Sequence, residues 1–225
     1  MVVLACSFAI AACASSRPSV FPSGTYAYAS NVANVPIDST VTVSRDATAI
    51  IVNEQYTFVK LPNVPAVSIV SRLDPATFSV ISYAVDNDPE GPDPSLTITP
   101  SGATYSVAGK KPVVQKAPVA AAPSWVFDTN RASAFAAVPA ILHATGAKVI
   151  NGYVPEIFKG SGMAWAFVPT DATVSRPEGV PAGDASLALA FHTRKMAMTT
   201  LWYDPATFVV SGVKIGNDTL WVRKN

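Results

Sequence analysis

Acidic side chains alternate in one short segment, and their type and spacing are those of oxygen ligands for a metal ion. Asp86, Asp88 and Glu90 stand at every second position before Gly91. Calcium takes about 6–8 oxygen ligands, and closely spaced carboxylates supply several of them. Counting from Asp86, however, position twelve is Thr97 rather than a bidentate glutamate. Calcium is therefore one interpretation of this segment, and a solvated hairpin loop is the other.

A basic cluster is the second candidate site. His192, Arg194 and Lys195 follow an apolar run and would form a cationic tip that contacts a carboxylate ligand or anionic headgroups. The alternative is an ordinary solvated turn. The other histidine, His143, falls in the last turn of a predicted helix, where the helix dipole favours a cation.

Hydrolysis would need a nucleophile, a base and a group that orients the base. Gly160-Ser161-Gly162 does not match the G-x-S-x-G nucleophile elbow, and the chain has no G-x-G-x-x-G or P-loop motif. No catalytic residue is assigned on this basis. A hydrolase whose site is assembled only in three dimensions stays open as an alternative.

The only cysteines are Cys6 and Cys13, near the start of the chain. Their position excludes a disulfide framework or a cysteine-based zinc site in the body of the chain. Residues 1–16 are apolar or small until the first basic residue at Arg17, and the run is shorter than the roughly 20 residues of a membrane-spanning helix. Its composition is typical of the hydrophobic part of a secretory signal.

Ile10-Ala11-Ala12-Cys13 resembles the lipobox of bacterial lipoproteins. In that family a small residue precedes the cysteine, which is diacylated and becomes the new N-terminus. The resemblance implies an exported protein, periplasmic or at the cell surface, anchored to a membrane through a lipid on Cys13. Two other interpretations stay open, namely a signal peptide cleaved near Ala14 and a buried N-terminal strand.

The rest of the chain predicts a mainly β protein with antiparallel sheets or a meander, in a sandwich-like or barrel-like arrangement. Apolar and polar residues alternate with a period of two around Val41, Tyr56 and Ile69, and short turn-forming breaks separate these runs. Around Phe167 and Leu189 bulky apolar residues alternate with alanines in the same period, so both faces of these strands are apolar. The 19 prolines also favour strands and turns over long helices. The four tryptophans, Trp125, Trp165, Trp202 and Trp221, are expected in the core rather than on a sugar-stacking surface.

One helical segment is expected between residues 131 and 145. Apolar side chains recur there at helical spacing, Asp128, Thr129 and Asn130 are N-cap candidates, and Gly146 suits the C-terminal end. Pro139 predicts a kink or two short helices.

Five identical residues occur twice, 130 positions apart: Asp74-Pro75-Ala76-Thr77-Phe78 and Asp204-Pro205-Ala206-Thr207-Phe208. Aspartate and proline are favoured at the first and second positions of a turn, so each copy predicts a hairpin turn. Either the chain contains a duplication or turn chemistry selected the same residues twice. In a duplication the two turns occupy equivalent places in two similar β units, and Phe78 and Phe208 are both expected in the core.

The predicted organisation is a signal and tether at 1–16, a β unit at 24–108, a linker at 109–123 and a second β unit with one helix at 124–225. An edge strand is the alternative for the Pro/Ala/Lys-rich linker.

The net charge is +1, which gives no basic excess for binding nucleic acid. We therefore expect a non-catalytic role, binding an unknown ligand or protein partner or scaffolding an assembly, with no cofactor unless the acidic loop binds calcium. A hydrolase and a structural surface component are the alternatives.

Overall fold

The computed structural model describes residues 21–32, 35–87, 93–107, 113–115, 119–128, 131–159, 163–177, 185–192 and 197–224. The elements run in the order β1 Gly24–Val32, β2 Val35–Arg45, β3 Ile50–Phe58, β4 Val67–Leu73, β5 Val80–Asp86, β6 Pro94–Thr99, β7 Gly102–Val107, β8 Val113–Gln115, β9 Ser124–Val126, α1 Ser133–Ala136, α2 Val138–Thr145, β10 Val149–Lys159, β11 Met163–Ser175, β12 Ser186–Phe191, β13 Thr199–Tyr203, β14 Val210–Ile215 and β15 Asp218–Arg223.

These strands form one continuous sheet in the order β8-β7-β6-β5-β4-β3-β2-β1-β15-β14-β13-β12-β11-β10-β9. Each strand pairs antiparallel with its neighbour, except that β9 runs parallel to β10. The sheet is not closed into a barrel. The prediction of a mainly β, antiparallel meander is thus confirmed.

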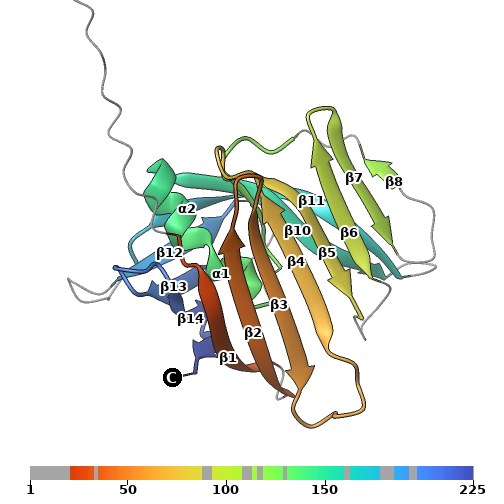
Figure 1. Ribbon diagram of the computed structural model, residues 1–225, viewed down its shortest axis with the longest axis vertical. Helices are drawn as coiled ribbons and strands as arrows, with labels where there is room; N and C mark the ends of the chain where they lie inside the picture. Colours follow the sequence, from red (N-terminus) through yellow and green to blue (C-terminus); the bar gives the residue numbers. More distant parts are fainter. Residues whose placement is uncertain are drawn as a thin grey trace, which may run out of the picture.

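The sheet curls so that its two ends face each other across the core (Figure 1). Phe167 on β11 packs against Tyr83 on β5, with ring centroids 5.8 Å apart, and against Tyr105 on β7 at 6.2 Å. The backbone N–H of Ser124 at the start of β9 also donates to the carbonyl oxygen of Phe78, at 3.2 Å. The alternating pattern is consistent with this shape, because β2 to β5 each bury one apolar face.

The two helices occupy the inner side of the curled sheet (Figure 1). Phe135 of α1 and Ile141 of α2 are fully buried. Pro139 lies in the first turn of α2 and Gly146 ends that helix in the left-handed conformation, with φ at 67°. The expected helical segment, its division into two short helices and its glycine end are confirmed.

Asp128, one of the N-cap candidates, does not cap the helix, because the residue that flanks α1 is Ala132 and makes no side-chain capping hydrogen bond. Glu54, from the middle of β3, accepts hydrogen bonds from the backbone N–H groups of Ala132 at 3.2 Å and Ser133 at 2.8 Å. Ser39 on β2 donates its hydroxyl to the same carboxylate, at 2.6 Å. A residue from a distant strand therefore caps the first N–H groups of the helical segment.

Asp128, one of the predicted caps, belongs to a second buried group beside Glu54. It accepts a hydrogen bond from the hydroxyl of Tyr83, at 2.7 Å, and lies 3.5 Å from the guanidinium of Arg131. Arg131 in turn donates to the hydroxyl of Tyr56 and lies over that ring, 4.5 Å from its centroid. Burial, with the neighbouring charge of Asp128, raises the pKa of Tyr83 well above its ordinary value, so this hydroxyl stays a donor. The other cap candidates, Thr129 and Asn130, lie outside the described residues.

The two D-P-A-T-F copies form the same turn. In each, the aspartate carboxylate accepts backbone N–H groups two and three residues later, and the phenylalanine N–H donates to the aspartate carbonyl oxygen. Phe78 and Phe208 both adopt positive φ, 55° and 58°, and each is 8% exposed. Such a conformation is uncommon for a bulky residue. The expected equivalence of the turns and the burial of both phenylalanines are confirmed.

The two predicted β units share this one sheet through the β1–β15 pairing. Within the predicted linker, Val113–Gln115 forms β8 and pairs with β7 at one edge. Whether the two units fold separately stays a prediction.

We expect Glu54→Ala to lower the free energy of unfolding by roughly 3–5 kcal/mol, because it leaves two helix N–H groups buried without their acceptor. Glu54→Gln keeps one acceptor oxygen and should cost less. Urea unfolding followed by circular dichroism measures both. Gln55→Ala, on the exposed face of the same strand, is the matched control. Equal stability of Glu54→Ala and the control would contradict the capping role.

The turns predict a pH dependence of stability. The backbone N–H groups of Thr77 and Ala76 lower the pKa of Asp74, and chiefly that of Ala206 lowers the pKa of Asp204. A depressed folded-state pKa contributes stability above the unfolded value of about 3.9, and this contribution is lost as the pH falls through the folded-state pKa. The double variant Asp74→Asn/Asp204→Asn should therefore lose less Tm than the native protein between pH 7 and pH 2.5. Asp86→Asn, outside both turns, controls for removal of a charge.

Candidate functional site

Several predicted site residues, Cys13, Asp88, Glu90, Arg194 and Lys195, lie outside the described residues. Asp86 is exposed at the end of β5, where its carboxylate accepts a hydrogen bond from the side-chain amide of Asn87, at 3.4 Å. Among the residues that the structure describes, no three His, Cys, Asp or Glu side chains come together to hold a metal ion. Calcium binding by the acidic loop is thus untested.

His192 lies in a hydrogen-bonded chain that the sequence did not reveal. Its Nδ1 is 2.5 Å from a carboxylate oxygen of Asp171, and its Nε2 is 2.9 Å from the hydroxyl of Thr173. Asp171 and Thr173 stand two positions apart on β11 and therefore share a face, and β12 delivers His192 beside them. The connectivity is that of an acid, a base and a hydroxyl nucleophile.

The described residues around this hydrogen-bonded network do not complete a hydrolytic site. Thr173 lies within a strand, and the N–H of Val174, the next residue, already donates to the carbonyl oxygen of Lys148 at 2.8 Å. An oxyanion needs donors that are free to meet it. The side chain of His192 is also 52% exposed. A surface hydrogen-bond network that fastens β12 to β11 accounts for this geometry.

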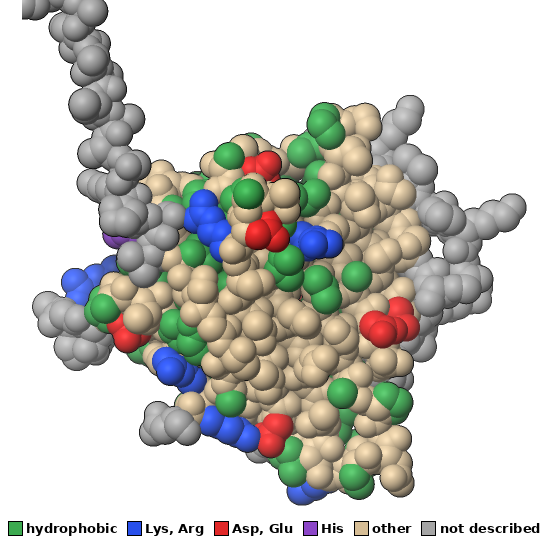
Figure 2. Space-filling view, in the orientation of Figure 1, with side chains coloured by type: hydrophobic (Ala, Val, Ile, Leu, Met, Phe, Trp, Pro, Cys, Tyr) green, Lys and Arg blue, Asp and Glu red, His purple; other side chains and the backbone are tan. Residues whose placement is uncertain are grey.

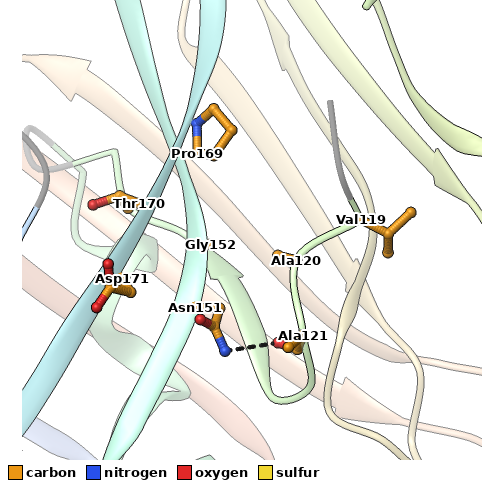
Figure 3. A pocket seen from close by; sticks show the side chains of 8 residues that line it. All are labelled: Val119, Ala120, Ala121, Asn151, Gly152, Pro169, Thr170 and Asp171. Carbon is orange, nitrogen blue, oxygen red and sulfur yellow. Dashed lines mark hydrogen bonds between the residues drawn. The ribbon is translucent and has the colours of Figure 1, made fainter. Parts of the chain in front are cut away.

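A shallow cavity of about 280 Å³ lies next to Asp171. Figure 3 shows its walls, which come from β10, β11 and the segment before β9, with the Asn151 side chain donating to the carbonyl oxygen of Ala121 at 3.0 Å. Gly152 forms part of the wall, and a Cβ there would lie 2.1 Å from the Trp125 carbonyl oxygen, so glycine is required for close packing of β9 on β10. The lining is mainly small side chains and backbone, with Asp171 as its charged group.

A second cavity, of about 220 Å³, opens beside the C-terminal end of α2, and we call it the α2 crevice. Its walls come from α2 and the residues after it, from β11, β12 and β13, and from the second D-P-A-T-F turn. The lining residues are Pro139, Leu142, His143, Gly146, Ala147, Lys148, Val174, Leu187, Tyr203 and Phe208.

One wall of the α2 crevice is a stack of three rings. The His143 ring lies on Phe208 with centroids 4.4 Å apart, and Tyr203 lies on the same phenylalanine at 6.2 Å. His143 and Lys148 are exposed at the rim, whereas Leu142, Leu187 and Phe208 are buried. An apolar floor with basic groups at the mouth suits an amphipathic ligand that carries an anionic group. Since the crevice is smaller than most ligand pockets, it fits one ring or a short chain rather than a whole large ligand.

The α2 crevice lies at the end of the sheet where β1 begins. In the sheet, β15 and β14 lie between β1 and β13, and each neighbouring pair is antiparallel. Strand β13 therefore runs opposite to β1, and its last residue lies at the end of the sheet where β1 begins. Phe21, the first described residue, packs on Phe78 of the equivalent turn with ring centroids 6.4 Å apart. The described chain therefore begins at the same end of the molecule as the crevice (Figure 1).

The sequence pattern predicts only that His143 lies at the helix end, and it does not predict the α2 crevice. A signal for it was present, because the repeated turn predicted that Phe208 would be buried. The rings that pack on Phe208 are those of His143 and Tyr203. The sequence does not predict the contact with His143, because it depends on where α2 packs against the sheet. Trp125 and Trp221 are buried as predicted, and Trp202 is half-buried; the Trp165 side chain lies outside the description.

No described helix has the length and apolar character required to cross a membrane. Comparison of the chain with protein-family models, with curated proteins and with solved structures finds no match.

Proposed function

We propose that this protein is exported, is held at a membrane by a lipid on Cys13, and binds an amphipathic ligand without catalysis in the α2 crevice. The observation that carries the proposal is the crevice itself, with its buried apolar floor, its wall of stacked rings and its two basic groups at the rim. This combination offers contact area for a hydrocarbon or ring and an attractive field for an anion.

The position of the α2 crevice supports a ligand that comes from a membrane surface. Cys13 precedes the first described residue by only eight positions, which corresponds to at most about 29 Å of extended chain. Because the described chain begins at the crevice end, a lipid on Cys13 would hold Phe21, and with it this end of the molecule, within that reach of the membrane. The ligand class that fits is an anionic amphiphile with a short chain or ring inserted among Leu142, Leu187 and Phe208.

The hydrolase alternative rests on the chain of Asp171, His192 and Thr173. It is the weaker candidate because the neighbouring N–H of Val174 is engaged and the ring of His192 is half exposed. A binding role needs no nucleophile, because the apolar floor, the stacked rings and the basic residues of the α2 crevice are sufficient for it.

We expect the protein to bind 1-anilinonaphthalene-8-sulfonate, a fluorescent anion with an aromatic ring that can enter the α2 crevice, and to enhance its emission. Ala147→Phe should fill the α2 crevice and weaken binding by about tenfold, the change that corresponds to ~1.4 kcal/mol. Lys148→Glu should weaken binding of this anion but not of N-phenyl-1-naphthylamine, the same compound without the sulfonate, because only the anion carries a charge to repel. Lys60→Glu, in the loop between β3 and β4, is the matched control and should bind as the native protein does.

Two results would contradict the binding function. One is no enhancement of emission by the native protein, and the other is native-like affinity in Ala147→Phe. Circular dichroism melts of each variant separate loss of binding from loss of folding.

The membrane anchor is tested independently of the ligand. Expressed in a bacterium with its signal, the native protein should partition into the detergent phase of a phase-separating detergent, because two acyl chains give stable membrane association. Cys13→Ser should move the protein to the aqueous phase. Cys6→Ser is the matched control and should leave the partition unchanged. If the native protein stays aqueous and its mature N-terminus is Ala14 or later, the lipid anchor is wrong.

A further inference from the structure

The cavity of about 280 Å³ beside Asp171, which we call the Asp171 cavity, carries charge of one sign only. Among the residues that line it, Asp171 is the single one with an ionisable side chain, as the close view shows (Figure 3). That side chain is 35% exposed, so its carboxylate is accessible and also partly shielded from water. An anionic ligand would be repelled here, whereas a cation would be attracted. The surface around the α2 crevice, seen in part in Figure 2, has the opposite character, because His143 and Lys148 stand at its rim.

Two side-chain oxygens at the Asp171 cavity are available as hydrogen-bond acceptors. Asp171 on β11 and Asn151 on β10 are cross-strand neighbours, so their side chains lie on the same face of the sheet. His192 contacts one carboxylate oxygen of Asp171, Oδ2, and Asn151 uses its amide nitrogen to donate to the carbonyl oxygen of Ala121. Within the part of the chain that the structure describes, the other carboxylate oxygen and the amide oxygen of Asn151 accept no hydrogen bond.

A protonated primary amine fits this pair of acceptors. An ammonium group carries one positive charge and three N–H donors. The Cβ atoms of cross-strand neighbours are about 4.5–5.5 Å apart, so one nitrogen can reach the side-chain oxygens of both Asp171 and Asn151. Water can accept the third N–H group at the open side of the cavity.

The remaining walls of the Asp171 cavity favour an organic cation over a metal ion. Calcium takes about 6–8 oxygen ligands, whereas the acidic and amide side chains here number only one each. Val119, Ala120 and Pro169 place carbon atoms along the cavity instead. Val119 is 44% exposed, so an alkyl chain in contact with it would remove apolar surface from water.

We propose that the Asp171 cavity binds a primary ammonium group carried on a short unbranched alkyl chain. The ammonium pairs with Asp171 and Asn151, and the chain lies against Val119 and Pro169. Free alkyl amines and the lysine side chain of a protein share this chemistry. The cavity is smaller than most ligand pockets and therefore takes such a group rather than a whole large ligand. No residue lines both this cavity and the α2 crevice, and the proposal does not depend on the crevice being a ligand site.

The test is an NMR titration of the full chain at pH 7, where primary amines are protonated. We expect 1,5-diaminopentane to shift the amide signals of Gly152 and Asp171 in a saturable way. Because one partly exposed ion pair contributes little, the dissociation constant should be on the order of 1 mM. 1-Pentanol and pentanoate, which have the same chain length and no positive charge, should not shift these signals.

A second arm uses Nα-acetyl-lysine amide, which presents the same group as a lysine side chain does. Tighter binding of this compound than of 1,5-diaminopentane assigns the site to the lysine of a protein partner, and weaker binding assigns it to a free amine. Either result supports the ammonium site itself.

Asp171→Asn removes the charge and should weaken binding of 1,5-diaminopentane by about fivefold. Asp218→Asn is the matched control, because Asp218 is exposed at the start of β15 outside the cavity, and it should bind as the native protein does. Thermal melts check that both variants are folded. The proposal is overturned if neither amine gives a saturable shift, if 1-pentanol gives the same shifts, or if the two variants bind alike.

Discussion

The carboxylate of Glu54 is the point at which the sheet and the helices depend on each other. It is fully buried in the middle of β3 and accepts hydrogen bonds from the first N–H groups of the helical segment and from Ser39. A buried carboxylate without donors is costly, and helix N–H groups without an acceptor are costly too. Neither the sheet nor the helices can therefore be stable in this form without the other.

The buried group beside Glu54 extends this dependence across the sheet. Arg131 and Asp128 join the start of the helical segment to Tyr56 on β3 and Tyr83 on β5. Because β3 and β5 are two strands apart, the network sets where the helices lie over the inner face. That position leaves α2 ending next to Phe208 and Tyr203, and the α2 crevice exists because the helix stops there at Gly146.

The two faces of the sheet have different chemistry because the alternation of side chains separates them. The inner face is apolar and is covered by the helices and by the curl of the sheet, except at the α2 crevice. The outer face of β1 to β7 is rich in hydroxyls and poor in charge, because the residues that alternate with the buried ones are mostly serine, threonine, alanine and amide residues.

The sequence by itself determined the local features of this protein. The period of two in the apolar residues was sufficient to predict the β class. Pro139 and Gly146 were sufficient to predict that the helical segment divides and where it ends. The repeated D-P-A-T-F was sufficient to predict two equivalent turns. These features follow from short-range sterics and hydrogen bonds, which act within a few residues. Only the tertiary structure decided that Glu54 caps the helix, that Asp171, His192 and Thr173 meet, and that His143 stacks on Phe208. Those contacts join residues from 19 to 79 positions apart. The chain offers many carboxylates, hydroxyls and rings that could take part in such contacts. Side-chain packing in the folded protein decides which of them meet, and a local sequence pattern does not encode that packing.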